Sequence, residues 1–333
     1  MMKLLSFDEA CQWFDSLPSH KKIATLSPHY VFVDALRDAR LRPTFIGMRQ
    51  GSSFWMHCVH CSDALEGEVI DLQSPYGYGG PISNSDDPAF LHFAWGLYTA
   101  FCSKQGWLAE FVRFHPLGSG QSGYGGKLIE DRQAVAIDLS VNDLRSTYST
   151  RCRTAVRKAL NNGLSVRIGS QQDMSNIFPE FYREGMRAIG AEEFYLFNDA
   201  YFASLSRWEK ARLLICYDGD DWLSAGIFLT EGDIMEYHLS TTVLKGRSLG
   251  ATNLLLDAAA HLGREQGSSY LYLGGGTDSA SNNPLFFFKQ GFSTSVYPFL
   301  IGFAAFDQNK YQTLRSLFIS EGKPVSRFLF YRG

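Results

Sequence analysis

Three polar residues at alternate positions carry the clearest chemical signal in this sequence. Glu236, His238 and Ser240 lie in a run that predicts a β-strand over residues 234–243. Alternate side chains of a strand share one face, and a histidine beside a carboxylate can accept a proton from an attacking amine near neutral pH. We therefore predict His238, assisted by Glu236, as a general base. The alternative is that these residues are simply polar groups on a solvated sheet face.

A basic, glycine-bearing segment, residues 244–252, follows that strand and leads into a predicted helix over residues 251–266. Backbone N–H groups and the positive dipole end at a helix N-terminus suit an anion such as a pyrophosphate. The order Arg-x-x-Gly-x-x resembles the acyl-CoA pyrophosphate loop of GNAT acetyltransferases, with Thr252 at the final small position. The candidate cofactor-binding residues are Arg247, Gly250, Ala251 and Thr252, whereas an ordinary surface loop before a helix is the alternative.

A glycine run follows the next predicted strand, residues 269–273. Glycines directly after a strand let a ligand approach the backbone closely, so Gly274 and Gly275 join the candidate cofactor-binding residues. Asp278, just beyond them, is a candidate substrate-binding residue.

Lys289 is the only charged residue in the aromatic segment 282–292. If it is buried beside the rings, its ammonium needs a partner, and a developing oxyanion or a phosphate is one candidate. We predict that Lys289 is an electrostatic stabiliser in the catalytic site. Alternatively, its side chain extends to solvent from a core helix.

A basic helix is predicted over residues 142–162. Arg153 and Arg157 lie four residues apart on one face of it, where they could grip phosphates, although a solvated charged face has the same pattern.

The elements that must position these residues alternate between strands and helices. Three consecutive strands, residues 211–217, 222–230 and 234–243, precede a strand–loop–helix–strand unit, so the second half is mixed α/β. The first half has a weaker version of the same succession. Its predicted helices cover residues 7–16 and 30–39 and a segment that Asp86-Asp87-Pro88 starts and that runs to about residue 105. Two related halves are expected, and 333 residues suit two domains, which we place at residues 1–142 and 143–333.

Composition excludes several classes of protein. The chain is 45% apolar and 20% charged, which excludes a largely disordered protein, and its net charge of −3 argues against a nucleic-acid-coating protein and a DNA partner. No segment is apolar for the ~20 residues that a membrane-spanning helix needs, and the first residues do not resemble a secretory signal. We expect a cytoplasmic protein with reduced cysteines.

Cys58 and Cys61 form a C-x-x-C pair beside His57 and His60. A structural zinc site needs a second ligand cluster, which this sequence does not offer, and the segment predicts a strand that points neighbours to opposite faces. We predict no metal site here.

The order of the motifs resembles the FemABX peptidyltransferase family and its FemAB-like relatives. The motifs are SPYGYGGP, RKALNNG, EYHLSTTVLKGRSLGATNLLLDAA and YLYLGGGTDSASNNPLFFFKQGF, and the resemblance covers roughly residues 30 to 320. It implies two tandem GNAT-like domains, each a mixed sheet flanked by helices, with a cleft between them. It also implies transfer of an acyl or aminoacyl group onto an amine.

The resemblance also carries roles onto particular residues. Lys289 matches the family's F-K-x-x-F element at the transfer site, and Arg153 and Arg157 fall in its basic helix, where acceptor phosphates are held. Tyr76, Gly77 and Tyr78 match the glycine–tyrosine loop of its first domain and become candidate substrate-binding residues. The long charged heptad insertion of the larger members is missing from this sequence.

We therefore predict an amide-forming N-acyltransferase or aminoacyltransferase that acts on an amine of a cell-envelope precursor such as a peptidoglycan precursor. The donor is a co-substrate, either acyl-CoA or aminoacyl-tRNA, and no tightly bound cofactor is expected. The alternatives are an acyl-CoA-dependent acetyltransferase or acyltransferase acting on an amino sugar or small amine, and a non-catalytic protein that binds a glycan or precursor.

Overall fold

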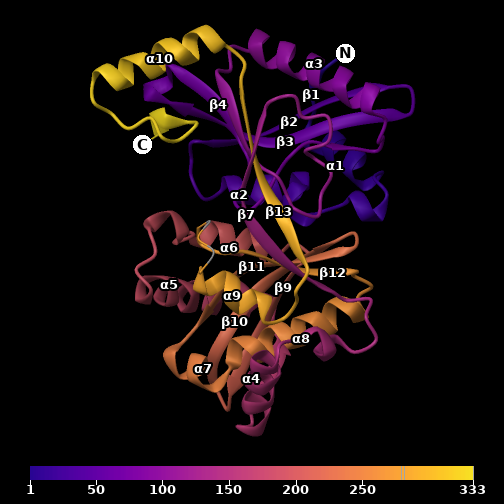
Figure 1. The fold of residues 1–333 in the computed structure, drawn as a ribbon, viewed down its shortest axis with the longest axis vertical. Helices are drawn as coiled ribbons and strands as arrows, with labels where there is room; N and C mark the ends of the chain where they lie inside the picture. The colour runs from indigo at the N-terminus through magenta and orange to yellow at the C-terminus, as the bar shows by residue number, and fades with distance from the viewer. Residues whose placement is uncertain (279, 281, 333) are drawn as a thin grey trace. The chain divides into compact units, whose positions relative to one another are not determined.

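The computed structural model describes residues 1–278, 280 and 282–332 (Figure 1). The chain forms two compact units. The first contains Met1–Asp131 and the chain from Phe299 onward, and the second contains Arg132–Pro298. We expected one domain boundary, between residues 142 and 143, whereas the units meet between residues 131 and 132 and again between residues 298 and 299. The chain returns to the first unit because strand β13 (Val296–Ala305) pairs with β6 (Ala109–Arg113), Ile301 opposite Arg113.

The first unit has a mixed sheet in the order β1-β2-β3-β4-β6-β13, with the short β5 paired to β3. The remaining strands are β1 (Lys3–Leu4), β2 (Leu41–Gln50), β3 (Ser53–Ala64), β4 (Val69–Gln73) and β5 (Ile82–Ser83). The helices are α1 (Phe7–Asp15), α2 (Pro28–Ala35), α3 (Pro88–Lys104) and α10 (Gln308–Ser320). Helix α3 begins where predicted, because the Asp87 side chain caps it and Pro88 occupies its first turn.

The second unit has a sheet in the order β7-β12-β11-β10-β9-β8, in which only β11 and β12 are parallel. Its strands are β7 (Lys127–Asp138, of which the part from Arg132 onward belongs to this unit), β8 (Ser165–Ile168), β9 (Ala211–Asp218), β10 (Asp221–Glu231), β11 (Ile234–Thr242) and β12 (Tyr270–Gly275). Its helices are α4 (Thr150–Asn161), α5 (Phe178–Ala188), α6 (Asp199–Leu205), α7 (Leu244–Leu249), α8 (Ala251–Glu265) and α9 (Pro284–Gln290).

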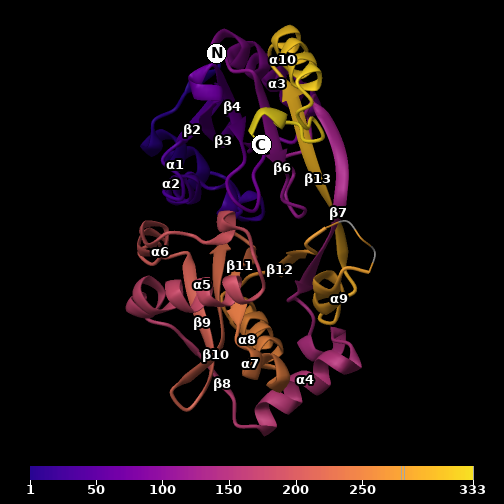
Figure 2. The ribbon, with the colours of Figure 1, turned by 90° about the vertical axis from the view of Figure 1, so that its left-hand side faces the viewer.

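Two helical layers cover the sheet of the second unit (Figure 2). On one face, Phe228 and Met235 share a buried apolar cluster with Val156 of α4 and Leu255 of α8. On the other face, α5 packs against β11. Strand β11 therefore lies between the two layers, and its alternate side chains reach different helices.

Most predicted elements of the second half are confirmed, including the three consecutive strands, the helix of α8 and the short helix α9. Two differ. The basic helix begins at Thr150 rather than at residue 142, because the Ser149 side chain caps it after a 3₁₀ turn over Leu144–Thr147. The predicted loop after β11 is instead helical as α7. Among the described residues, no helix is both long enough and apolar enough to cross a membrane.

Candidate active site

Strand β11 carries a β-bulge at His238. Tyr237 lies opposite Phe228 and Leu239 lies opposite Ile227, so His238 has no residue opposite it on β10. A bulge changes the alternation of side chains along a strand. This is why the predicted common face of Glu236, His238 and Ser240 is wrong for Ser240. The Ser240 hydroxyl donates to the Tyr237 hydroxyl, on the face that α4 and α8 cover.

Glu236 and His238 point to the opposite face of β11. Tyr237 packs against the α4–α8 cluster, so its neighbour Glu236 faces the other layer, where the side chain is 2% exposed. His238 reaches α6 in that layer, and its Nε2 lies 2.6 Å from the hydroxyl oxygen of Tyr201. The bulge thus aims a half-buried imidazole out of the sheet at a phenol.

Tyr201 was not predicted from the sequence as a site residue. It is fully buried, and the Asn198 side chain, which caps α6, accepts from its backbone N–H at 2.9 Å. Tyr201 lies 37 residues before His238 in a segment with no motif, so only the fold reveals the pair.

Strands β11 and β12 run side by side for three residue pairs and then separate. Their parallel register runs from Ile234/Tyr270 to Glu236/Tyr272, although β11 continues to Thr242. Strand β12 has a bulge of its own between Tyr272 and Gly274 against β7, and Gly274 has a φ of 78°. A bulge bends a strand. His238 therefore lies just beyond the point where two parallel strands diverge, and a gap between diverging parallel strands is a common place for a ligand in α/β sheets.

Lys289, on helix α9, contacts the last residue of strand β12. Its side chain is 8% exposed, and its Nζ donates to the backbone oxygen of Gly275 at 2.7 Å. Burial lowers the pKa of Lys289 to about 7. The side chain thus does not extend to solvent, and the structure brings two predicted site residues, Lys289 and Gly275, into contact. Near neutral pH this lysine can both hold and release a proton.

The segment between β12 and α9 is tied together by its own side chains. Asn283 caps α9 by accepting from Leu285 N and Phe286 N, and its amide donates to Thr277 Oγ1 at 2.7 Å and Asp278 Oδ1 at 3.1 Å. The backbone N–H of Ala280, followed by the Asn283 amide, lowers the pKa of Asp278. The exposed Asp278 thus organises the turn that holds Lys289.

The basic segment differs from the predicted phosphate loop. Residues 244–249 form α7, and Gly250, at φ 81°, ends α7 and begins α8 directly. Gly246 lets α7 lie against β10, because an added Cβ would come within 2.4 Å of Leu223 O. The Thr252 hydroxyl bonds that of Thr242 at 2.7 Å, and Ala251 is buried. Arg247 is exposed, and no side chain caps the N-terminus of α8.

The two arginines of α4 that were predicted as site residues have different surroundings. The Arg153 guanidinium donates to the backbone oxygens of Tyr148 and Arg145 and to Thr150 Oγ1, at the start of the helix. Arg157 is exposed, and within the described part of the chain no carboxylate pairs with it. Of these two arginines, Arg157 is therefore the one that presents its cation at the surface.

The glycine–tyrosine loop of the first unit is held by a buried charged network. Asp34 Oδ2 accepts from Tyr76 N and from His60 Nε2, each at 2.8 Å, while Arg113 donates to three backbone oxygens of the loop, including that of Gly77 at 3.2 Å. Burial opposes the ionisation of Asp34, but the His60 hydrogen bond and the Arg37 charge hold its pKa at about 2.

Three further residues that the sequence singled out lie in the first unit. The ring of Tyr78 packs edge-on against that of His115 at 4.9 Å. Cys58 and Cys61 lie on β3, which confirms the strand predicted there, and both are buried. Among the residues that the structure describes, no three His, Cys, Asp or Glu side chains are grouped as metal ligands.

The fold of the chain is similar to that of tandem GNAT-like structures, as the comparison with solved structures shows. No protein-family model matches the sequence, and no curated protein sequence is significantly similar to it. FemX is similar over 95% of this chain and 99% of its own, with a TM-score of 0.72 and 12% identity.

Two other structures support the same fold. The C-terminal domain of a putative lysylphosphatidylglycerol synthetase from Agrobacterium fabrum is similar over 94% of this chain and 98% of its own, with a TM-score of 0.59 and 14% identity. A tandem GNAT protein from the clavulanic acid biosynthesis pathway is similar over 92% and 98%, with a TM-score of 0.50 and 11% identity. The expected FemAB-like, tandem GNAT fold is confirmed.

Proposed function

We propose that this protein is an N-acyltransferase of the FemX type, which forms an amide bond between an acyl or aminoacyl group and an amine. The observation that carries the proposal is the position of His238, on a bulge where β11 leaves β12, in a chain with the full-length fold of FemX. Buried Glu236 and Tyr201 lie beside His238 on β11, and buried Lys289 contacts the end of β12, so these strands carry groups that can exchange protons or stabilise charge.

In the proposed reaction, the amine nitrogen attacks the carbonyl carbon of the donor, and the bond to the donor's sulfur or oxygen breaks. His238 takes the proton that the amine loses. The Tyr201 oxygen, 2.6 Å from Nε2, orients the ring and accepts a hydrogen bond from the imidazolium. The Lys289 ammonium stabilises the negative charge that develops on the carbonyl oxygen or on the leaving group.

The order of the motifs and the fold together suggest a donor and an acceptor. FemX and the lysylphosphatidylglycerol synthetases lead us to propose an aminoacyl or acyl donor, aminoacyl-tRNA or acyl-CoA, and an amine of a cell-envelope precursor as acceptor. Exposed Arg157 is the residue of α4 that we propose for a phosphate of either substrate.

The test is a transfer assay with both donors and a nucleotide-linked muropeptide acceptor, in which the amide product is identified by mass spectrometry. The proposal predicts product with the wild-type protein and at least a 100-fold slower rate with His238→Ala. Tight acceptor binding with no product from any donor would instead favour a non-catalytic precursor-binding protein.

An acyl-CoA-dependent acyltransferase acting on a small amine or amino sugar is the second candidate. The specific support is the uncapped N-terminus of α8 beside exposed Arg247, which together suit a pyrophosphate. Acetyl-CoA that raises the melting temperature of the wild-type protein, with a smaller shift for Arg247→Ala, would favour this candidate. Lys245→Ala is the matched control, because Lys245 already pairs with Asp218 at 3.1 Å.

A further inference from the structure

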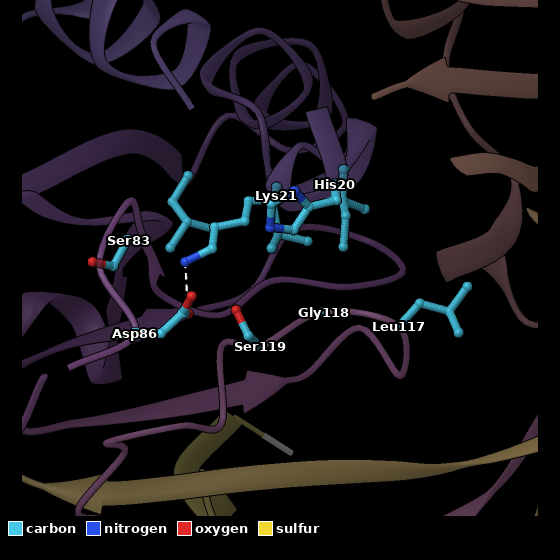
Figure 3. A pocket seen from close by; sticks show the side chains of 10 residues that line it. His20, Lys21, Ser83, Asp86, Leu117, Gly118 and Ser119 are labelled. Carbon is cyan, nitrogen blue, oxygen red and sulfur yellow. Dashed lines mark hydrogen bonds and ion pairs between the residues drawn. The ribbon is translucent and has the colours of Figure 1, made fainter. Parts of the chain in front are cut away.

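The first unit contains a hollow that none of the proposed chemistry uses (Figure 3). Its volume is about 220 Å³, and its lining comes from three separate segments, residues 20–26, 82–86 and 117–119. A water molecule takes about 30 Å³ of liquid, so the hollow has room for about seven waters or one small organic molecule.

The charged group inside this hollow is the ammonium of Lys21. Its side chain is only 8% exposed, and its Nζ lies 2.6 Å from Oδ1 of Asp86. The Asp86 side chain, in contrast, is 77% exposed at the rim (Figure 3). The pair is therefore asymmetric: the carboxylate can swing into water at little cost, whereas the buried ammonium needs an anion in its place.

The rest of the lining is mixed, with the polar residues His20, Ser83 and Ser119 beside apolar side chains. Ile23, Leu26 and Ile82 are each at most 7% exposed and form part of its wall. The absence of a side chain at Gly118 lets its backbone lie close to Ile23, because an added Cβ would lie 3.2 Å from Ile23 Cδ1. The hydroxyl of Ser83 is already committed, since it donates to Phe54 O at 2.6 Å and accepts from Ser85 N at 3.0 Å.

We propose that this hollow binds a small aliphatic carboxylate, whose carboxylate replaces that of Asp86 on Lys21 and whose chain lies against Ile23, Leu26 and Ile82. A carboxylate fits because Asp86 already places one at hydrogen-bonding distance from Nζ. A single ammonium matches the charge of a monoanion, whereas a phosphate dianion would bring a second negative charge that Lys21 alone does not balance. In this arrangement Asp86 competes with the ligand for Lys21.

The experiment is a titration of the full-length protein, with ¹³C-labelled isoleucine and leucine methyl groups, by butanoate. The proposal predicts saturable NMR shifts of the Ile23, Leu26 and Ile82 methyls, and no such shifts with butylammonium. Lys21→Met should weaken butanoate binding at least 10-fold, and Asp86→Asn should strengthen it several-fold because the competing carboxylate is gone. Lys22→Met is the matched control, since Lys22 Nζ bonds Asp15 O instead, and its affinity should equal that of the wild type.

Three results would overturn the proposal. Equal shifts with butanoate and butylammonium would show that the charge of Lys21 does not select an anionic ligand. Inorganic phosphate that binds more tightly than butanoate would assign the hollow to a different anion. If Lys21→Met does not fold, Asp86→Asn still decides, because unchanged or weaker butanoate affinity in that exposed variant contradicts the displacement.

Discussion

The hydroxyl oxygen of Tyr201 lies 2.6 Å from Nε2 of His238, which joins helix α6 to the bulge of strand β11. The phenol is fully buried, and the bulge aims the imidazole at it. A histidine held in this way has a fixed ring orientation, which a general base requires.

We predict that Tyr201→Phe lowers kcat of the proposed transfer about 10-fold, with a smaller change in KM, because the hydrogen bond that orients His238 is lost while the ring packing stays. Steady-state kinetics with a saturating donor give both constants. Tyr237→Phe is the matched control, because Tyr237 lies on the other face of β11 and bonds Ser240. Equal losses in both variants would indicate a general effect on the strand instead.

Lys289 should make stability depend on pH. Burial lowers its pKa to about 7 from 10.5, so between these values the unfolded chain binds a proton that the folded chain does not. The free energy of unfolding of the wild type should therefore rise relative to that of Lys289→Met by about 1.4 kcal/mol per pH unit from about pH 7 to about pH 10. Urea unfolding of both proteins at pH 7, 8 and 9 measures the difference; a constant difference would contradict this prediction.

The same substitution separates stability from catalysis. Lys289→Met should be at least as stable as the wild type at pH 7, because it removes a buried amine, yet it should slow transfer about 100-fold or more if the ammonium stabilises the transition state. Transfer at the wild-type rate by a folded Lys289→Met protein would remove Lys289 from the mechanism.

Gly250→Ala should destabilise the second unit by two separate effects. Its φ of 81° strains any residue with a Cβ, and that Cβ would lie 2.6 Å from Ala155 O of α4. Gly163 has a similar φ of 78° with no atom within 4 Å of an added Cβ, so Gly163→Ala measures the strain alone. We expect a loss of about 1 kcal/mol for Gly163→Ala and about 1–3 kcal/mol more for Gly250→Ala in chemical denaturation. Equal losses of stability in the two variants would show that α4 moves away from the added Cβ at little cost.

Asp34 should stabilise the first unit at neutral pH. Its pKa is about 2 in the folded protein against an ordinary 3.8, so the ionised form contributes about 2 kcal/mol above pH 4, which is lost as the pH falls toward 2. Asp34→Asn should have a lower melting temperature than the wild type at pH 7. This difference in melting temperature should be smaller near pH 3. A pH-independent difference would mean that the hydrogen bonds of Asp34, and not its charge, stabilise the loop at Tyr76.

Much of the second unit could be predicted because its local signals agree. The strands of β9 to β11 have regular apolar patterns, and Asn283 and Pro284 mark the start of α9 in the sequence. In the first unit β4 was not predicted, because its five residues are interrupted by Asp71. That carboxylate is buried only because Arg332 pairs with it, Nε to Oδ2 at 2.7 Å, from 261 residues away.

The site was predicted less completely, for reasons that lie in the fold. His238, Lys289 and Gly275 stood out by residue type. The alternation of polar and apolar residues does not reveal a β-bulge, however, and the bulge in β11 places Ser240 on the other face of the strand. The sequence also did not predict that residues 244–249 form helix α7. Gly246 suggested a phosphate loop, whereas the glycine allows close packing on Leu223.

The measurement that tests the central claim most directly is a single-turnover transfer assay with wild-type protein and His238→Ala, using labelled acyl-CoA and aminoacyl-tRNA in separate reactions with an amine acceptor. We predict that the wild type forms a labelled amide with one of the two donors, and that His238→Ala forms it at least 100-fold more slowly while its melting temperature is retained. Amide formation at the same rate by both proteins would contradict the assignment of the active site to the β11 bulge.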